Sequence, residues 1–153
     1  MGVNVYDTGD YPYQGNREAL TTATVVQSTW TNQGAEFKTM GAGAIEVVFR
    51  MKPNSVDNVT VLKWRAMFKL TAGGILHQEQ KYAGDTETIT VREHKFDPTA
   101  NSHVDLTQGA TEVQAGFLIN PLSYSYCQLQ IFSTSDGAAG QPTVEALEIR
   151  RMK

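Results

Sequence analysis

The stretch NVTVLKWRAMFKLT, residues 58–71, decides the fold class of this chain. Large apolar side chains occupy every second position in it, and basic side chains stand between them. A period of two places alternate side chains on opposite faces of a strand, whereas a helix would scatter them around its circumference. The apolar set comprises Leu62, Trp64, Ala66, Phe68 and Leu70, and the basic set comprises Lys63, Arg65 and Lys69. The stretch therefore predicts a strand that buries one face, with Trp64 in the core.

The same alternation occurs elsewhere in the chain. Just upstream, apolar and charged residues alternate over residues 45–52, and turn-forming residues separate this segment from the first stretch. The two segments are therefore expected to be antiparallel neighbours. Further strands are predicted at residues 21–30, 75–82, 86–92, 112–119, 124–132 and 143–151, with a shorter one at 36–40. Because no helical pattern separates them, the chain is expected to be all-β, an antiparallel β-sandwich of jelly-roll type.

Residues 1–20 depart from this pattern and are interpreted as an extended N-terminal arm before a β-sandwich domain at residues 21–153. The arm mixes apolar anchors with Gly, Pro and Asp, so it cannot form a core of its own. Its anchors are Val3, Val5, Tyr6, Tyr11 and Tyr13. Such a segment either covers an edge of its own sandwich or buries its side chains against a neighbour. The anchors are therefore the candidate partner-binding residues.

Composition narrows the classes of partner. The net charge is −3 and the charges are interspersed, so we expect neither nucleic acid nor a membrane surface as a partner. The N-terminus has no secretory pattern, and no apolar run approaches the length of a membrane span, so synthesis in a cytoplasm is expected. The single cysteine, Cys127, cannot form an intrachain disulfide and is expected in the core.

The longest predicted loop, residues 94–111, together with the residue before it, contains a cluster of residue types that can bind a metal. Two histidines and three carboxylates stand within 13 residues, and they are Glu93, His94, Asp97, His103 and Asp105. Their spacing matches no established ligand motif, and the same composition suits a solvated loop. No Gly-x-Ser-x-Gly elbow and no phosphate-binding glycine motif occurs. We expect no catalysis, cofactor or metal, although an enzyme site assembled from loops stays open.

Aromatic residues supply a second hypothesis. The flat rings of Trp30, Trp64, Tyr124 and Tyr126 could stack on sugars. Trp64 falls on the predicted buried face, whereas Trp30 ends a predicted strand and is the better candidate. The alternative function is therefore a carbohydrate- or receptor-binding module, including a phage tail or fibre component.

In general plan, with an arm at residues 1–20, a compact β domain and no catalytic motif, the chain resembles the small jelly-roll decoration, or cement, proteins of tailed-bacteriophage capsids. The resemblance implies a noncatalytic virion structural protein, made in the host cytoplasm and placed on the capsid surface. It implies homo-oligomers, trimers among them, that contact the major capsid protein or other virion subunits. It also implies that the arm anchors stabilise the shell through subunit contacts.

Overall fold

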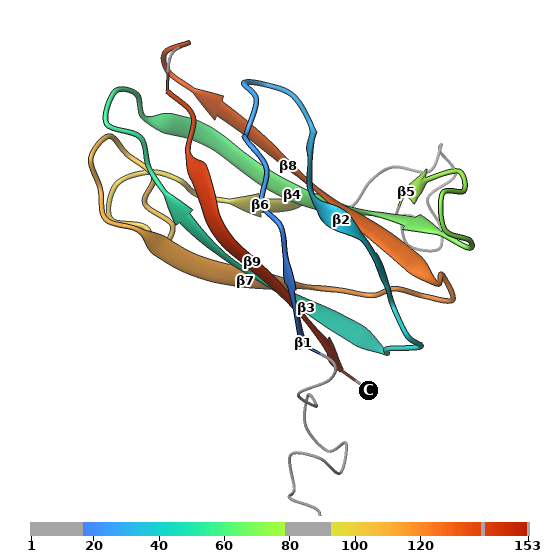
Figure 1. The fold of residues 1–153 in the computed structure, drawn as a ribbon. Helices are drawn as coiled ribbons and strands as arrows, with labels where there is room; N and C mark the ends of the chain where they lie inside the picture. The colour runs from blue at the N-terminus through green and yellow to red at the C-terminus, as the bar shows by residue number, and fades with distance from the viewer. Residues whose placement is uncertain (1–16, 79–92, 139, 153) are drawn as a thin grey trace, which may run out of the picture.

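The computed structural model describes residues 17–78, 93–138 and 140–152, which form nine strands and no helix (Figure 1). Within these ranges there is accordingly no helix able to cross a membrane. The predicted arm anchors at residues 3–13 and the predicted strand at 86–92 lie outside the described residues.

One sheet contains four antiparallel strands in the order β1-β9-β3-β7. Their bounds are Arg17–Leu20 for β1, Thr143–Met152 for β9, Ala44–Lys52 for β3 and Val113–Ile119 for β7. The predicted strands at residues 45–52, 112–119 and 143–151 are confirmed here, because alternation survives where one face of a strand is buried and the other is in water. The predicted pairing of 45–52 with 58–71 is wrong: residues 44–52 pair with β7 and β9, and residues 59–69 belong to the other sheet.

The second sheet contains five antiparallel strands in the order β2-β8-β4-β5, with β6 also paired to β4. Their bounds are Thr31–Lys38 for β2, Tyr126–Ser135 for β8, Val59–Lys69 for β4, His77–Gln78 for β5 and His94–Phe96 for β6. Both short strands pair with the edge of β4 that faces away from β8. The predicted strand at 124–132 is confirmed with a later start and end.

The pairing is nested along the chain. Strand β1 pairs with β9, β2 with β8, β3 with β7, and β4 with β5 and β6. Folding such a nested antiparallel ribbon over on itself yields two packed sheets, and this is the jelly-roll connectivity. The expected all-β sandwich is therefore confirmed.

The core lies between the two sheets. Leu62, Trp64, Ala66 and Phe68 of β4 are at most 1% exposed, and the Trp64 ring stacks on Phe49 with centroids 5.0 Å apart. Cys127 is also buried, as expected. Leu70, predicted on the same face, is instead 60% exposed, because β4 ends at Lys69 and the chain turns away.

The predicted strand at residues 21–30 is wrong. The fully buried side chain of Gln33 takes the place of a ladder partner there: its Nε2 donates to the carbonyl of Ala23 and its Oε1 accepts from the same residue's N–H, both at 2.8 Å. The segment's only β-bridge to a described strand is the isolated one between Gln27 and Ser133. Buried Val25 supplied a strand-like apolar signal without strand geometry.

Strand β2 begins at Thr31, five residues before the predicted start at 36. Gly34 lies inside it with a φ of 75°, and the pairing with β8 shifts register between Gln33 and Phe37. This bulge explains the difference, because a glycine among polar residues interrupts the alternation by which a strand is predicted from sequence. Adding a Cβ at Gly34 would place it 2.8 Å from the Cβ of Leu20, so the bulge also makes room for β1.

Residues 17–20, which the sequence places in the N-terminal arm, form β1 and pair with β9. Arg151, 5% exposed, holds this strand in place. Its Nη2 lies 2.6 Å from a Glu18 carboxylate oxygen, and its Nε donates to the carbonyl of Lys38 at 2.7 Å. One arginine thus joins β1, β2 and β9 at the open side of the sandwich.

Candidate functional site

One end of the sandwich gathers exposed apolar side chains. Lys38 of β2 and Lys69 of β4 both lie opposite Tyr126 of β8, so the loops at residues 39–43, 70–76 and 120–125 meet at this end. In Figure 1 these loops lie on the right-hand side. Their exposed apolar residues are Met40 at 65%, Leu70 at 60%, Ile75 at 84%, Leu76 at 37% and Leu122 at 51%. We refer to these five residues as the apolar end.

The β2–β3 turn holds Met40 in an unfavourable backbone conformation. The N–H of Ala42 donates to the carbonyl of Thr39 at 3.1 Å, and the two residues between them have φ angles of 55° at Met40 and 69° at Gly41. Two successive positive φ angles define a type I′ turn, in which Asn, Asp or Gly normally stands at the first position. A methionine there costs roughly 1–2 kcal/mol.

The neighbouring β7–β8 turn also places a large apolar residue, Leu122, at a positive φ, although only this one of its two central residues has a positive φ. The N–H of Tyr124 donates to the carbonyl of Pro121 at 3.1 Å, and Leu122 between them has a φ of 52°. Asn120 fixes the turn, since its Oδ1 accepts from the Leu122 N–H at 2.9 Å. Met40 and Leu122 each have a positive φ and expose at least half of their surface. Their side chains therefore contribute little to the stability of the isolated domain. Strain of this kind is a recognised mark of functional positions.

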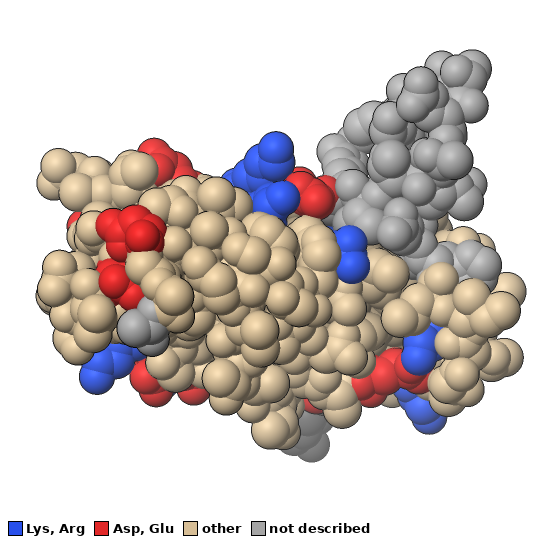
Figure 2. Space-filling view, turned by 90° about the horizontal axis from the view of Figure 1, so that it is seen from above, with Lys and Arg blue, Asp and Glu red and all other residues tan. Residues whose placement is uncertain are grey.

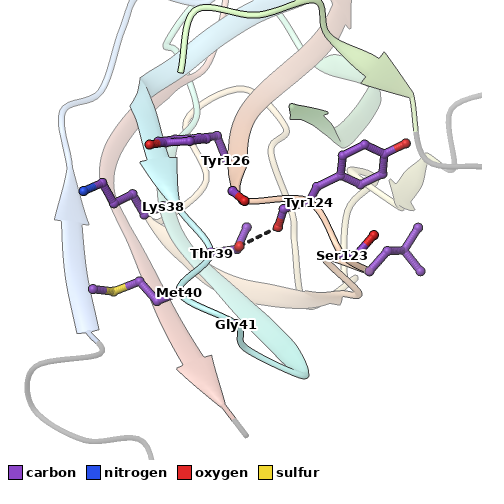
Figure 3. A pocket seen from close by; sticks show the side chains of 9 residues that line it. Lys38, Thr39, Met40, Gly41, Ser123, Tyr124 and Tyr126 are labelled. Atoms are coloured by element: carbon purple, nitrogen blue, oxygen red, sulfur yellow. Dashed lines mark hydrogen bonds between the residues drawn. The ribbon is translucent and has the colours of Figure 1, made fainter. Parts of the chain in front are cut away.

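A pocket of about 310 Å³ lies between these two turns (Figure 3). It is lined by residues 38–41 and 122–126. Thr39 joins the two sides, because its Oγ1 donates to the carbonyl of Tyr124 at 2.6 Å and its N–H donates to the carbonyl of Ser125 at 2.8 Å. The Tyr124 ring stacks on buried Phe68 with centroids 5.6 Å apart. The pocket is therefore preformed on the core, and an apolar side chain could enter it.

The opposite end of the sandwich is polar and cross-linked. Asn58 donates from its backbone and its side chain to the Asp136 carboxylate at 2.9 and 2.8 Å. These bonds lower the pKa of Asp136 below its ordinary value. Gln108 donates to the Asn58 side chain and to the carbonyl of Ser55 at 2.8 and 2.9 Å. Polar side chains thus join the loops at this end, whereas the loops of the apolar end carry exposed apolar side chains.

The predicted arm joins the domain at the apolar end. Arg17 lies opposite Arg150 near the end of β9, and the N–H of Gly43 in the β2–β3 loop donates to the carbonyl of Met152 at 2.9 Å. Figure 1 shows β1 and the C-terminus close together in the lower part of the view. The start of the described chain and the apolar end therefore face the same direction.

Charged side chains elsewhere are largely paired. On the outer face of the first sheet, the Glu148 Oε1 lies 3.0 Å from the Arg17 Nε and 3.3 Å from the Arg150 Nε. The Arg150 Nη1 also lies 3.3 Å from the Glu46 Oε1. Figure 2 shows basic and acidic side chains in small groups on a mostly uncharged surface. Exposed pairs of this kind contribute about 0–1 kcal/mol each.

The histidine- and carboxylate-containing loop uses its side chains for structure. Glu93 pairs with Lys63 at 3.3 Å, and the His94 ring stacks on Phe117 with centroids 4.4 Å apart. Thr99 donates to Asp97 from its N–H and its hydroxyl, and these bonds lower the pKa of Asp97. Asp105 accepts from Thr107 in the same way, with the same effect on its pKa. Across residues 17–78, 93–138 and 140–152, no three His, Cys, Asp or Glu side chains gather as metal ligands would.

The two tryptophans differ in burial, as predicted. Trp64 is fully buried, whereas Trp30 is half-buried immediately before β2. Trp30 contacts Phe132, with ring centroids 5.4 Å apart, and the Arg65 guanidinium lies 4.1 Å from its ring centroid. Sequence reasoning missed Met40 and Leu122. The available signal was a large apolar residue beside Gly41 or Pro121, where turn residues are usual.

No protein-family model, curated protein or solved structure matches the chain.

Proposed function

We propose that the protein is a noncatalytic structural component of a virion, a capsid decoration protein that contacts both neighbouring copies of itself and the capsid through the apolar end. The observation that supports this proposal best is the pair of strained, exposed turn residues, Met40 and Leu122. Their side chains gain burial only when a partner covers them. The jelly-roll connectivity adds support by fold analogy, because viral capsid domains use it, although lectins do so as well.

Docking would gain energy mainly from apolar burial. A fully buried side chain of this size contributes about 1.5–3 kcal/mol, and the five residues of the apolar end are only partly exposed. Covering all five would therefore contribute on the order of 5 kcal/mol before the cost of association. One such contact is weak. Repeated around a homo-oligomer and a symmetric shell, it becomes effective because later attachments are intramolecular.

The N-terminal arm supplies the second attachment in this proposal. Its anchors Val3, Val5, Tyr6, Tyr11 and Tyr13 would bury their side chains against the major capsid protein or another virion subunit. Because the arm joins the domain at the apolar end, both attachments would serve one interface. The protein would be made in the host cytoplasm and act on the capsid surface.

Co-sedimentation with capsids of the same virus that lack this protein tests the proposal. Deletion of residues 1–16, which leaves β1 intact, and the double substitution Met40→Asn with Leu122→Gly should each weaken binding at least tenfold. Val56→Asn is the matched control, since Val56 is 58% exposed but lies at the polar end. Undiminished capsid binding by both test variants would refute the proposal.

A further inference from the structure

The outer face of the β2-β8-β4 sheet carries two neighbouring rows of side chains in register. Gln130 lies directly opposite Asn32 on one side and Arg65 on the other, which gives a polar row across three strands. Phe132, two residues further along β8, lies opposite Lys63 and contacts Trp30. An aromatic row thus runs beside the polar row.

Hydrogen bonds fix the polar row. The Nε of Arg65 donates to the Gln130 Oε1 at 2.7 Å, and the Gln130 Nε2 donates to the Asn32 Oδ1 at 2.8 Å. Each amide oxygen in the row is therefore engaged by its neighbour. The groups with no hydrogen-bond partner among the described residues are N–H donors: the terminal amino groups of Arg65 and the Nδ2 of Asn32.

The Arg65 guanidinium is held over the Trp30 ring. Its carbon lies 4.1 Å from the ring centroid, which is within the range of a cation–π contact. The terminal N–H groups of a guanidinium form the edge that binds carboxylates bidentately. The contact with Trp30 and the hydrogen bond to Gln130 therefore position Arg65 for an anion.

The nearby acidic group, Glu93, favours the charged form of Arg65 but forms its ion pair with Lys63. Glu93 lies 3.3 Å from the Lys63 Nζ, and that ammonium lies 4.7 Å from the Phe132 ring centroid. The face is thus rich in donors and carries a half-buried indole. A ligand that suits it has an apolar ring face, an anionic group and several acceptor oxygens.

We propose that this face binds acidic pyranose sugars, with the sugar carboxylate on the Arg65 edge. Asn32 donates to a ring hydroxyl, and a C–H face of the sugar packs on the solvent-exposed part of Trp30. This site lies on a sheet face, whereas the assembly proposal uses the apolar end, so the two stand independently.

The test is titration of the full chain with oligogalacturonate and with the neutral galacto-oligosaccharide of equal length, followed by calorimetry and tryptophan fluorescence. Buried Trp64 gives a constant background, so a saturable fluorescence change reports Trp30. We expect a dissociation constant of about 1 mM or tighter for the acidic sugar and at least tenfold weaker binding of the neutral one.

Arg65→Lys keeps the charge but removes the planar edge, and it should weaken acidic-sugar binding at least tenfold. Asn32→Ala should weaken it about threefold, a loss of the size expected for one hydrogen bond. Arg50→Lys, on the outer face of the other sheet, should leave it unchanged. Equal binding of acidic and neutral sugars, no saturable binding, or full binding by Arg65→Lys would each overturn the proposal. Because Arg65 and Asn32 are not core residues, these variants keep the fold, and circular dichroism confirms it.

Discussion

Replacing Met40 with asparagine should stabilise the isolated protein although it removes an apolar side chain. Asparagine tolerates the left-handed region, so the substitution relieves about 1–2 kcal/mol of strain. Met40 is 65% exposed and buries only a third of its surface, which contributes about 0.5–1 kcal/mol. The net gain is therefore between about 0 and 1.5 kcal/mol, or a rise of up to about 6 °C in the melting temperature for a chain of this size.

Thermal and urea unfolding followed by circular dichroism measure this change. Val56→Asn is the control, because Val56 is similarly exposed but its φ is not positive. That variant should be neutral or slightly destabilised. If Met40→Asn destabilised the protein by more than about 1 kcal/mol, methionine would be favoured by the fold itself, and the reasoning that a partner explains it would fail.

Three further predictions concern the fold. Gly34→Ala should destabilise by about 2–3 kcal/mol in urea unfolding, since its Cβ would meet Leu20 in a left-handed backbone; unchanged stability would contradict the bulge geometry. Arg151→Leu should lower the free energy of unfolding by about 1–3 kcal/mol and expose β1 to proteolysis. The reason is the loss of the ion pair between buried Arg151 and half-exposed Glu18 and of the hydrogen bond to the Lys38 carbonyl. If β1 were not cleaved in the variant, this role of Arg151 would be wrong. Acid should destabilise the loops below about pH 4, because three of their carboxyl groups have lowered pKa values in the folded protein. Such a carboxyl contributes stability above its ordinary pKa of 3.8, and this contribution is lost as the pH falls through the pKa that the group has in the folded state. Stability that stays flat from pH 6 to pH 2.5 would exclude such a contribution. The carboxyls concerned are Asp97, Asp105 and Asp136.

Alternation predicted the strands whose two faces have different environments. Residues 58–71 and 143–151 were readable because every second side chain enters the core. Residues 21–30 misled the prediction, because the Gln33 side chain supplies the hydrogen bonds of Ala23 from ten residues away. A hydrogen-bond partner from another part of the chain does not change the pattern of apolar and polar residues in the segment that it holds, so sequence periodicity cannot reveal it.

The candidate surfaces were predictable only in part. Trp30 stood out as an aromatic residue at a strand end, but its neighbours Arg65 and Gln130 come from other strands and require the register to be known. Met40 and Leu122 depend on positive φ angles, which a sequence with apolar residues at turn positions does not reveal. Both surfaces arise from which strands the jelly roll places side by side.

Light scattering of the purified protein tests the assembly proposal most directly. We predict that the full chain forms a closed oligomer, a multiple of its 16.8 kDa mass, and that Met40→Asn with Leu122→Gly shifts it toward monomer while raising or preserving its melting temperature. The Val56→Asn control should keep the oligomeric mass. A full chain that is strictly monomeric, or a double variant with the same oligomeric mass as the full chain, would contradict self-assembly through the apolar end.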